Sequence, residues 1–328
     1  MPSVLITGSS GFVGSCTREE FANAGWQTIG IGRRKTDQSS YIRADLAKPF
    51  TDDVLAAIKG VDVVLHAAAR SSPWGTRKQF HAANVTATEN IVQACQDNGC
   101  PKLLFVSSSS VYYRPEDQFG INEFTPLAVP AVNHYADSKQ LAERVVKNYR
   151  GDWVILRPRA VYGKGDSVLF PRILAAAKAG KLPLLTRPDS PVVGDLISID
   201  NLAHYIIKAA TDKSILGEFN LTDNEPQEII AFLLNVFDRL GIARPTKQIP
   251  VATAFRIARV IELLYGAFLP WKEPPITRFG VHVFAYSKVF DVANMLERLG
   301  PPPLTTAQSV DRFVAWVHEV DPYGLSQP

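Results

Sequence analysis

Cysteine is scarce in this chain, with three residues among 328. Cys16, Cys95 and Cys100 are odd in number and lack the paired spacing of a zinc site or of a dithiol redox motif. The sequence therefore gives no support for a metal centre. We expect reduced thiols that pack as small apolar side chains, which suits a cytoplasmic protein.

Blocks of like charge and long apolar runs are also missing. The net charge of +3 comes without any Lys/Arg cluster, so binding to nucleic acid has no electrostatic support. The apolar run near the N-terminus is four residues at most, too short for a signal peptide or a membrane-spanning helix. We expect a cytoplasmic protein that binds no nucleic acid.

The chain does have an ordinary soluble composition, 46% hydrophobic and 20% charged, and a regular rhythm in its first half. Short apolar runs alternate there with helical stretches, which favours parallel strands buried on both faces and joined by right-handed crossovers. We expect strands at 4–7, 27–31, 41–43, 61–66, 102–107 and 153–157. The sequence therefore predicts an α/β fold with a Rossmann-type, doubly wound parallel sheet.

After residue 157 the rhythm breaks into proline-rich connections and helices. We expect these helices at 168–179, 227–240, 252–269, 289–299 and 305–317, and interpret most of them as a smaller, mostly helical lobe that covers a substrate. The segments 195–199 and 201–210 read as one more strand and helix of the sheet. We therefore assign residues 1–160 and about 192–212 to the sheet domain, and about 161–191 and 213–328 to the substrate lobe.

A glycine-rich turn, TGSSGFVG at residues 7–14, separates the first expected strand from the first expected helix. Gly8 permits a tight turn, Gly11 lets the backbone approach a phosphate, and Gly14 lets the helix pack closely on the strand. Free N–H groups and the positive end of the helix then face an anion. This order of strand, turn and helix is typical of a dinucleotide-binding site.

Tyr135 and Lys139 lie four residues apart in 134–149, a stretch with helical apolar spacing, so a phenol and an ammonium group share one helix face. The pair can act as a general acid/base if the tyrosine pKa falls by about three units, which takes roughly 4 kcal/mol of differential stabilisation of the phenolate. The lysine and an oxidised nicotinamide, both cationic, could supply this stabilisation. Nearby, the strand at 102–107 leads into Ser107 to Ser110, which places hydroxyls where open α/β sheets bind ligands.

Taken together, these motifs resemble the extended short-chain dehydrogenase/reductase family, which includes nucleotide-sugar epimerases and dehydratases and 3β-hydroxysteroid dehydrogenases. The resemblance covers nearly the whole chain. Further motifs that carry it are Asp45-Leu46, His66-Ala67-Ala68-Ala69, Asn84-Val85 and LRPRAVYGKGD at 156–166.

The resemblance implies roles for individual residues. Tyr135 would be the proton donor or acceptor, Lys139 would bind the nicotinamide ribose and lower the tyrosine pKa, and Asn84 would support a proton relay. Counting back from Val111-Tyr112 selects Ser108 as the hydroxyl that orients the carbonyl, with Ser109 as second choice. The cofactor would be bound by Gly8, Ser10, Gly11, Phe12, Val13, Gly14, Arg33, Arg34, Asp45, Leu46, Ala67, Ala68, Ala69, Pro158 and Val161, together with Tyr135 and Lys139.

The second half of the chain indicates the branch of the family. Sugar-nucleotide enzymes tend to carry an asparagine just before the VYG motif, whereas this chain has Arg157-Pro158-Arg159-Ala160 there. This favours the 3β-hydroxysteroid dehydrogenase-like branch, as do segments 72–75, 273–278 and 290–301, which look like those of 2-alkyl-3-oxoalkanoate reductases. The resemblance implies an apolar substrate with a secondary alcohol or ketone, contacted by Ser109, Trp74, Arg159 and Tyr162.

Cofactor preference is readable at the end of the second expected strand. NAD enzymes place an acidic side chain there, whereas this chain offers Arg33 and Arg34 and has no carboxylate before Asp37. A guanidinium makes charge-assisted hydrogen bonds to a 2′-phosphate. We therefore favour NADP(H), with NAD(H) as the alternative.

Two contact surfaces are expected outside the site. Residues 252–269 form an apolar helix with interspersed charges at Arg256, Arg259 and Glu262, which favours a helix that covers the pocket or meets a partner subunit over one at a membrane surface. By analogy with the family, helices at 76–98 and 134–149 would form a homodimer.

Three functions are compatible with these motifs. We favour net oxidoreduction of an alcohol and ketone. An epimerase or dehydratase cycle would return the cofactor unchanged, and a non-catalytic nucleotide sensor or scaffold would not need to retain Tyr135, Lys139, Asn84 and a serine strand end together.

Overall fold

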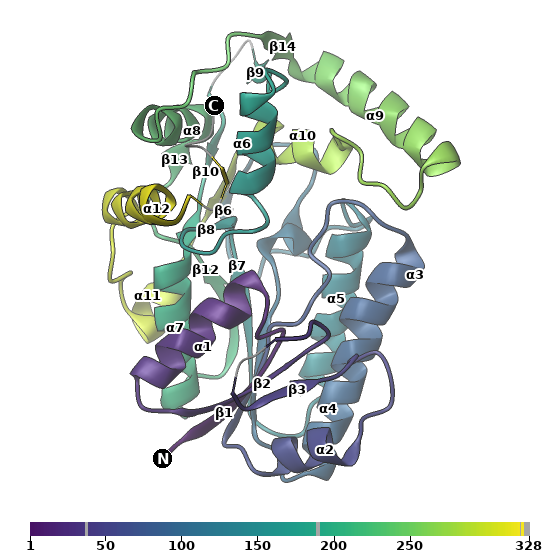
Figure 1. Cartoon of the computed structure of the whole chain (residues 1–328), viewed down its shortest axis with the longest axis vertical. Helices are drawn as coiled ribbons and strands as arrows, with labels where there is room; N and C mark the ends of the chain where they lie inside the picture. The colour runs from purple at the N-terminus through teal and green to yellow at the C-terminus, as the bar shows by residue number, and fades with distance from the viewer. Residues whose placement is uncertain (37–38, 188–190, 322, 325–328) are drawn as a thin grey trace.

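The computed structural model describes residues 1–36, 39–187, 191–321 and 323–324, so Asp37 lies outside the described residues. At its centre is a seven-stranded sheet in which every neighbouring pair is parallel (Figure 1). In spatial order the strands are β12 (Gly217–Leu221), β7 (Trp153–Pro158), β5 (Lys102–Val106), β4 (Val63–His66), β1 (Ser3–Thr7), β2 (Gln27–Gly32) and β3 (Tyr41–Arg43). The chain order reverses between β1 and β4, the position where doubly wound sheets bind ligands.

Helices cover both faces of this sheet because its strands are apolar on both sides. In β1, Val4 and Ile6 belong to one hydrophobic core and Leu5 belongs to the other. One face is covered by α1 (Phe12–Asn23), α7 (Ile199–Thr211) and α11 (Ala293–Leu299), and the other by α2 (Asp52–Lys59), α4 (Ala87–Asp97) and α5 (His134–Lys147). The predicted doubly wound α/β fold is confirmed.

A second lobe lies beyond the carboxyl ends of the sheet strands (Figure 1). Its helices α6 (Phe170–Lys178), α8 (Ile229–Arg239) and α12 (Thr306–Val320) share a core of their own. Its four-stranded sheet consists of β13 (Gln227–Glu228), β10 (Val193–Gly194), β15 (Lys288–Phe290) and β6 (Gln118–Ile121). The remaining elements are the pairs β8 (Val161–Tyr162) with β11 (Ile197–Ser198) and β9 (Leu184–Thr186) with β14 (Gln248–Pro250), and helices α3 (Arg77–Phe80), α9 (Val251–Phe268) and α10 (Arg278–Ala285).

The six strands expected in the first half are all present, but the seventh was wrongly predicted. Residues 195–199 contribute only Ile197–Ser198, which pairs with β8 outside the main sheet. The seventh strand is β12, whose polar Glu218 and Asn220 interrupt the apolar run that would have marked it. The helix expected at 289–299 begins only at Ala293, because residues 288–290 form β15.

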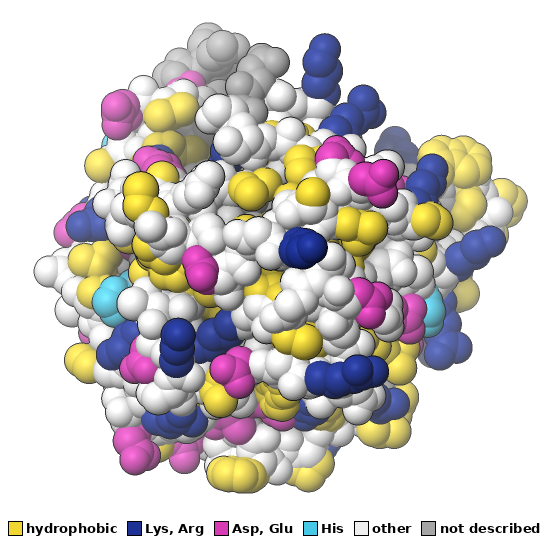
Figure 2. Space-filling view, turned by 90° about the horizontal axis from the view of Figure 1, so that it is seen from below, with side chains coloured by type: hydrophobic (Ala, Val, Ile, Leu, Met, Phe, Trp, Pro, Cys, Tyr) yellow, Lys and Arg dark blue, Asp and Glu magenta, His cyan; other side chains and the backbone are white. Residues whose placement is uncertain are grey.

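Helix α9 lies at the edge of the second lobe and packs on α10 mainly through small side chains. Ala254 and Ala258 are its buried residues, whereas Val260, Leu264 and Phe268 are exposed. No helix among the described residues combines the length and apolar character needed to cross a bilayer. Seen from below in Figure 2, basic and acidic side chains are mixed over the surface.

Candidate active site

The serines that follow β5 differ in burial and in their hydrogen-bond partners. The Ser107 hydroxyl donates to Glu143 Oε1 at 2.5 Å, and Ser109 Oγ lies 3.0 Å from Tyr113 Oη. These two serines are buried, whereas Ser108 is partly exposed, and its hydroxyl interacts with the Tyr135 side chain and acts to lower its pKa. The structure therefore brings Ser108, rather than Ser109, to the candidate acid/base.

Helix α5 presents Tyr135 and Lys139 one turn apart, as expected from their spacing. Asn133 starts the helix, because its Oδ1 accepts a hydrogen bond from the Ala136 backbone N–H at 2.8 Å. The Lys139 Nζ donates to the Val106 carbonyl at 2.7 Å and lies 4.5 Å from the centre of the Phe105 ring. Lys139 is thereby fixed at the carboxyl end of β5, with 2% of its surface exposed.

The pKa values of this pair differ from the sequence expectation. Burial raises the pKa of Tyr135 to about 12, although the hydrogen bond from Ser108 works in the opposite direction. Burial also lowers the pKa of Lys139 to about 7, and the nearby Glu143 only partly offsets this effect. The protein by itself therefore does not produce the acidic phenol that the sequence suggested, since desolvation outweighs any attraction from Lys139.

The lysine gives a pH-dependent prediction for stability. Its pKa is near 7 in the folded protein and about 10.4 when unfolded, so between these values the unfolded state binds more protons and the stability rises with pH. The wild-type protein should gain roughly 4 kcal/mol over this range that Lys139→Met does not gain. Urea unfolding from pH 6 to 10 measures this, and parallel curves for the two proteins would contradict it.

Asn84 lies in a π-helical segment, His81–Thr86, between α3 and α4. Its Nδ2 donates to Ser138 Oγ at 2.8 Å and to the Arg70 carbonyl at 3.2 Å, and its Oδ1 accepts from the Arg70 N–H at 2.7 Å. Ser138 in turn donates to the Tyr135 carbonyl at 2.7 Å. Among the described residues no hydrogen bond joins Asn84 to the Tyr135 hydroxyl, so in this structure Asn84 links the loop after β4 to the start of α5.

A buried histidine at the end of β4, for which no role was predicted, fixes the loop that follows this strand. His66 Nδ1 lies 2.7 Å from Thr7 Oγ1, and its Nε2 lies 3.0 Å from Thr88 Oγ1. Thr7 Oγ1 also accepts from the Ala68 N–H at 3.2 Å. Burial and then Lys139 lower the pKa of His66 to about 3, so it is a neutral positioning residue. The signal that marked it was a polar residue at the end of an apolar strand.

The glycine turn has the form that a dinucleotide requires. Gly8 has a φ of +70°, and a Cβ there would lie 2.8 Å from Ala68 Cα. A Cβ on Gly14 would meet the Gly8 carbonyl oxygen at 2.3 Å, so Gly14 allows α1 to pack on the turn. A Cβ on Gly11 would meet only the Gly8 carbonyl oxygen, at 3.2 Å. The residues present therefore fit a nucleotide cofactor.

The basic residues expected after β2 lie beside this turn. Arg33 and Arg34 are exposed, and Arg34 Nη1 donates to the Ser10 carbonyl at 3.3 Å. Asp45 Oδ1 accepts from the Ala47 N–H at 3.2 Å, and the Leu46 carbonyl accepts from Asn90 at 2.8 Å. The other expected cofactor contacts lie in α1 (Phe12, Val13), in the loop after β4 (Ala67, Ala68, Ala69), at the end of β7 (Pro158) and in β8 (Val161).

Two of the expected substrate contacts lie away from this cluster. Tyr162 is fully buried in the core of the second lobe, where its hydroxyl donates to Asp223 at 3.3 Å, so it offers no surface to a substrate. Trp74 donates from Nε1 to the Pro270 carbonyl at 3.3 Å and lines a hollow of about 300 Å³ beside α9. Its loop therefore connects the first domain to the segment between α9 and α10.

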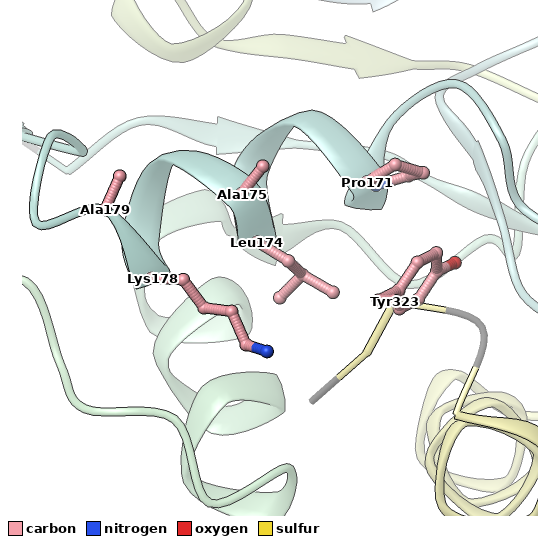
Figure 3. A pocket seen from close by; sticks show the side chains of 6 residues that line it. All are labelled: Pro171, Leu174, Ala175, Lys178, Ala179 and Tyr323. Atoms are coloured by element: carbon pink, nitrogen blue, oxygen red, sulfur yellow. The ribbon is translucent and has the colours of Figure 1, made fainter. Parts of the chain in front are cut away.

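A separate hollow of about 540 Å³ lies between α6 and Tyr323 (Figure 3). Its polar groups are already bonded: Lys178 Nζ contacts the Gly324 carbonyl and Tyr323 Oη donates to the Asp166 carbonyl at 2.9 Å. It contains no residue of the Tyr135 cluster. Across the described ranges, no group of three His, Cys, Asp or Glu side chains is placed to hold a metal ion.

Comparisons with known proteins agree with this geometry. Residues 4–221 match the model of the NAD dependent epimerase/dehydratase family. The chain is 30% identical to a 2-alkyl-3-oxoalkanoate reductase of Shewanella oneidensis, over 93% of this chain and 83% of the relative. It is 26% identical to a decarboxylating sterol-4-alpha-carboxylate 3-dehydrogenase of Mus musculus, over 96% and 91% of the two chains. The fold is also similar to that of a UDP-glucuronic acid 4-epimerase from Bacillus cereus, solved with NAD, with a TM-score of 0.71 at 19% identity over 98% and 99% of the chains.

Proposed function

This chain belongs to the NAD dependent epimerase/dehydratase family of enzymes, and on that premise we propose that it interconverts a secondary alcohol and a ketone on a largely apolar substrate. The observation that carries the proposal is the position of the Ser108 hydroxyl beside that of Tyr135 at the carboxyl end of β5, close enough to act on its pKa, with Lys139 one turn further along α5. Two hydroxyl groups placed together can polarise and protonate a carbonyl oxygen.

We assign Ser108 to hold the carbonyl oxygen and Tyr135 to exchange a proton with it. Because the pKa of Tyr135 is about 12, its hydroxyl is protonated at neutral pH and ready to act as an acid in reduction. The nicotinamide cofactor, when bound, supplies the hydride in reduction and accepts it in oxidation. We propose that Lys139, which donates to the Val106 carbonyl, binds the ribose of that cofactor.

The cofactor that we propose is NADP(H). Arg33 and Arg34 support this, because both are exposed at the end of β2 and Arg34 reaches the glycine turn at Ser10. A ribose 2′-phosphate at that position would accept charge-assisted hydrogen bonds from the guanidinium groups.

Replacing Arg33 with alanine tests the cofactor assignment. We expect the affinity for NADPH to fall about tenfold or more, because a charged hydrogen bond contributes roughly 1.5–3 kcal/mol, and the affinity for NADH to change little. Titration of protein fluorescence with each reduced cofactor measures both affinities. Lys35→Ala, which removes an exposed charge two residues away, is the matched control. Equal losses for the two cofactors would refute the NADP(H) assignment.

The relatives suggest the chemistry next to the reacting carbon. The names 2-alkyl-3-oxoalkanoate reductase and sterol-4-alpha-carboxylate 3-dehydrogenase both place the reacting group at carbon 3 and a carboxyl group on the neighbouring carbon. We propose that the substrate of this chain has the same β-hydroxy or β-keto acid unit on an apolar body.

A spectrophotometric screen tests the proposed function. Apolar ketones, β-keto acids, sterols and sugar nucleotides are each offered with NADPH and with NADH, and absorbance reports net loss of the reduced cofactor. We expect net consumption with an apolar keto compound. Conversion of a sugar nucleotide without net cofactor loss would support an epimerase or dehydratase instead. Cofactor binding without any turnover would favour a sensor or scaffold.

A further inference from the structure

Arg159 carries a buried guanidinium that makes no hydrogen bond to any residue that the structure describes. It follows β7 and has 3% of its surface exposed. Its Nε is buried without a hydrogen-bond partner, and no hydrogen bond or ion pair of its guanidinium occurs among the described residues. A guanidinium has five N–H donors and stays charged, so burying it unpaired is costly unless a ligand completes it.

Tyr113 is a neighbour both of the Arg159 guanidinium and of the candidate active site. The Arg159 Cζ is 5.3 Å from the centre of the Tyr113 ring. The Tyr113 hydroxyl is bonded to Ser109 in the serine run, and Tyr113 is near enough to Tyr135 to help raise its pKa. A substrate held between Ser108 and Tyr135 therefore has Arg159 as a neighbour.

The charged groups around Arg159 and Lys288 are of both signs. Lys288 is also buried, with Nζ 5.7 Å from the centre of the Tyr113 ring. Asp117, Glu116 and Arg187 act on Lys288, and Asp195 interacts with Arg159. Asp117 is paired with Arg187 at 2.8 Å, whereas Asp195 accepts the Phe290 N–H at 2.8 Å.

Among the described residues no ion pair joins Arg159 to Asp195, although Arg159 favours the charged form of that carboxyl group and acts to lower its pKa. The neighbouring His282 is neutral at pH 7, because burial, Lys288 and Arg159 lower its pKa to about 4. The buried guanidinium still lacks a hydrogen-bond acceptor, and a carboxylate matches its fork.

We propose that Arg159 binds the carboxylate of the substrate, and so selects substrates with an acid group next to the reacting carbon. This inference rests on the proposed function, since it places the reacting carbon between Ser108 and Tyr135. Arg159 is then a binding residue that fixes the direction in which the carbonyl approaches Tyr135.

A binding experiment tests this assignment without turnover. The probe is 2-hexyldecanoate, which has the acid group and two alkyl chains but no reacting hydroxyl, and its primary amide is the neutral counterpart. Calorimetric titration of the wild-type protein should give tighter binding of the acid than of the amide. Arg159→Met should lose about 100-fold in affinity for the acid, as expected when one partner of a buried charge pair is removed, and little for the amide. Equal affinities of the wild-type protein for acid and amide would overturn the assignment.

A kinetic experiment separates this inference from the proposed function. The substrates are 3-hydroxy-2-alkyl acids, with their methyl esters as neutral counterparts. Arg159→Met should lower kcat/KM about 100-fold for the acid and no more than a few fold for the ester, and Arg159→Lys should fall between wild type and Arg159→Met. Arg239→Met, an exposed arginine paired with Asp311 on α12, is the matched control. Turnover with equal losses for acid and ester would refute the role of Arg159 but leave the proposed oxidoreductase intact, whereas absence of any turnover would count against the proposed function alone.

Discussion

Tyr135→Phe is expected to lower kcat by about a thousandfold, because general acid catalysis by a positioned side chain contributes roughly 10²–10⁴ in rate. The phenylalanine ring fills the same volume on α5 and lacks only the hydroxyl, which interacts with Ser108 in the wild-type protein. The affinity for the nicotinamide cofactor should change little, since Lys139 remains bonded to the Val106 carbonyl. Single-turnover kinetics and fluorescence titration measure the two quantities separately.

The matched control for this variant is Tyr149→Phe. Tyr149 follows the C-terminal end of α5, whereas Tyr135 lies at its start. Its buried hydroxyl donates to the Pro101 carbonyl at 2.6 Å. This variant should lose some stability and keep kcat within a few fold. If Tyr135→Phe retained wild-type turnover, Tyr135 would not be the acid and the proposed mechanism would have to be abandoned.

The sheet and the cofactor turn could be predicted from the sequence because they depend on local patterns. The alternation of apolar runs and helices defines six strands, and the glycines at 8, 11 and 14 follow from the steric demands of one turn. Strand β12 could not be found in this way, since Glu218 and Asn220 interrupt its apolar character and its partner β7 is distant in sequence.

The electrostatics of the site could not be predicted, because they depend on burial. The spacing of Tyr135 and Lys139 indicates a shared helix face, yet it does not show that desolvation raises one pKa and lowers the other. The sequence also could not predict the surroundings of Arg159, because its neighbours Tyr113 and Lys288 come from other parts of the chain. Ser108, the serine that the sequence favoured, lies beside Tyr135 because Ser107 and Ser109 are bonded elsewhere, and its role in orienting a carbonyl stays a prediction.

Helix α5, which carries Tyr135 and Lys139, is also held by a buried ion pair that the sequence did not reveal. Arg157 on β7 and Glu143 on α5 each have 1% of their side-chain surface exposed. The Arg157 Nε and Nη2 donate to the two Glu143 oxygens at 2.8 and 2.6 Å, and Nη1 donates to the Tyr112 hydroxyl at 2.5 Å. Glu143 lies one turn beyond Lys139 and also accepts from Ser107, so the pair fixes α5 against the strands that carry the site.

Arg157→Met should therefore lower the free energy of unfolding by about 3–5 kcal/mol, because it leaves the Glu143 carboxylate buried without its partner. The double variant Arg157→Met/Glu143→Leu should recover most of this loss, since an apolar pair of similar volume removes both buried charges together. Glu218, which also pairs with Arg157, is partly exposed and keeps its ion pair with Lys147. Urea unfolding of the wild type, the two single variants and the double variant gives the coupling energy between the residues. We expect that coupling to be strongly favourable. Losses that simply add in the double variant would mean that the two side chains act independently, and that α5 is held on the sheet by apolar packing alone.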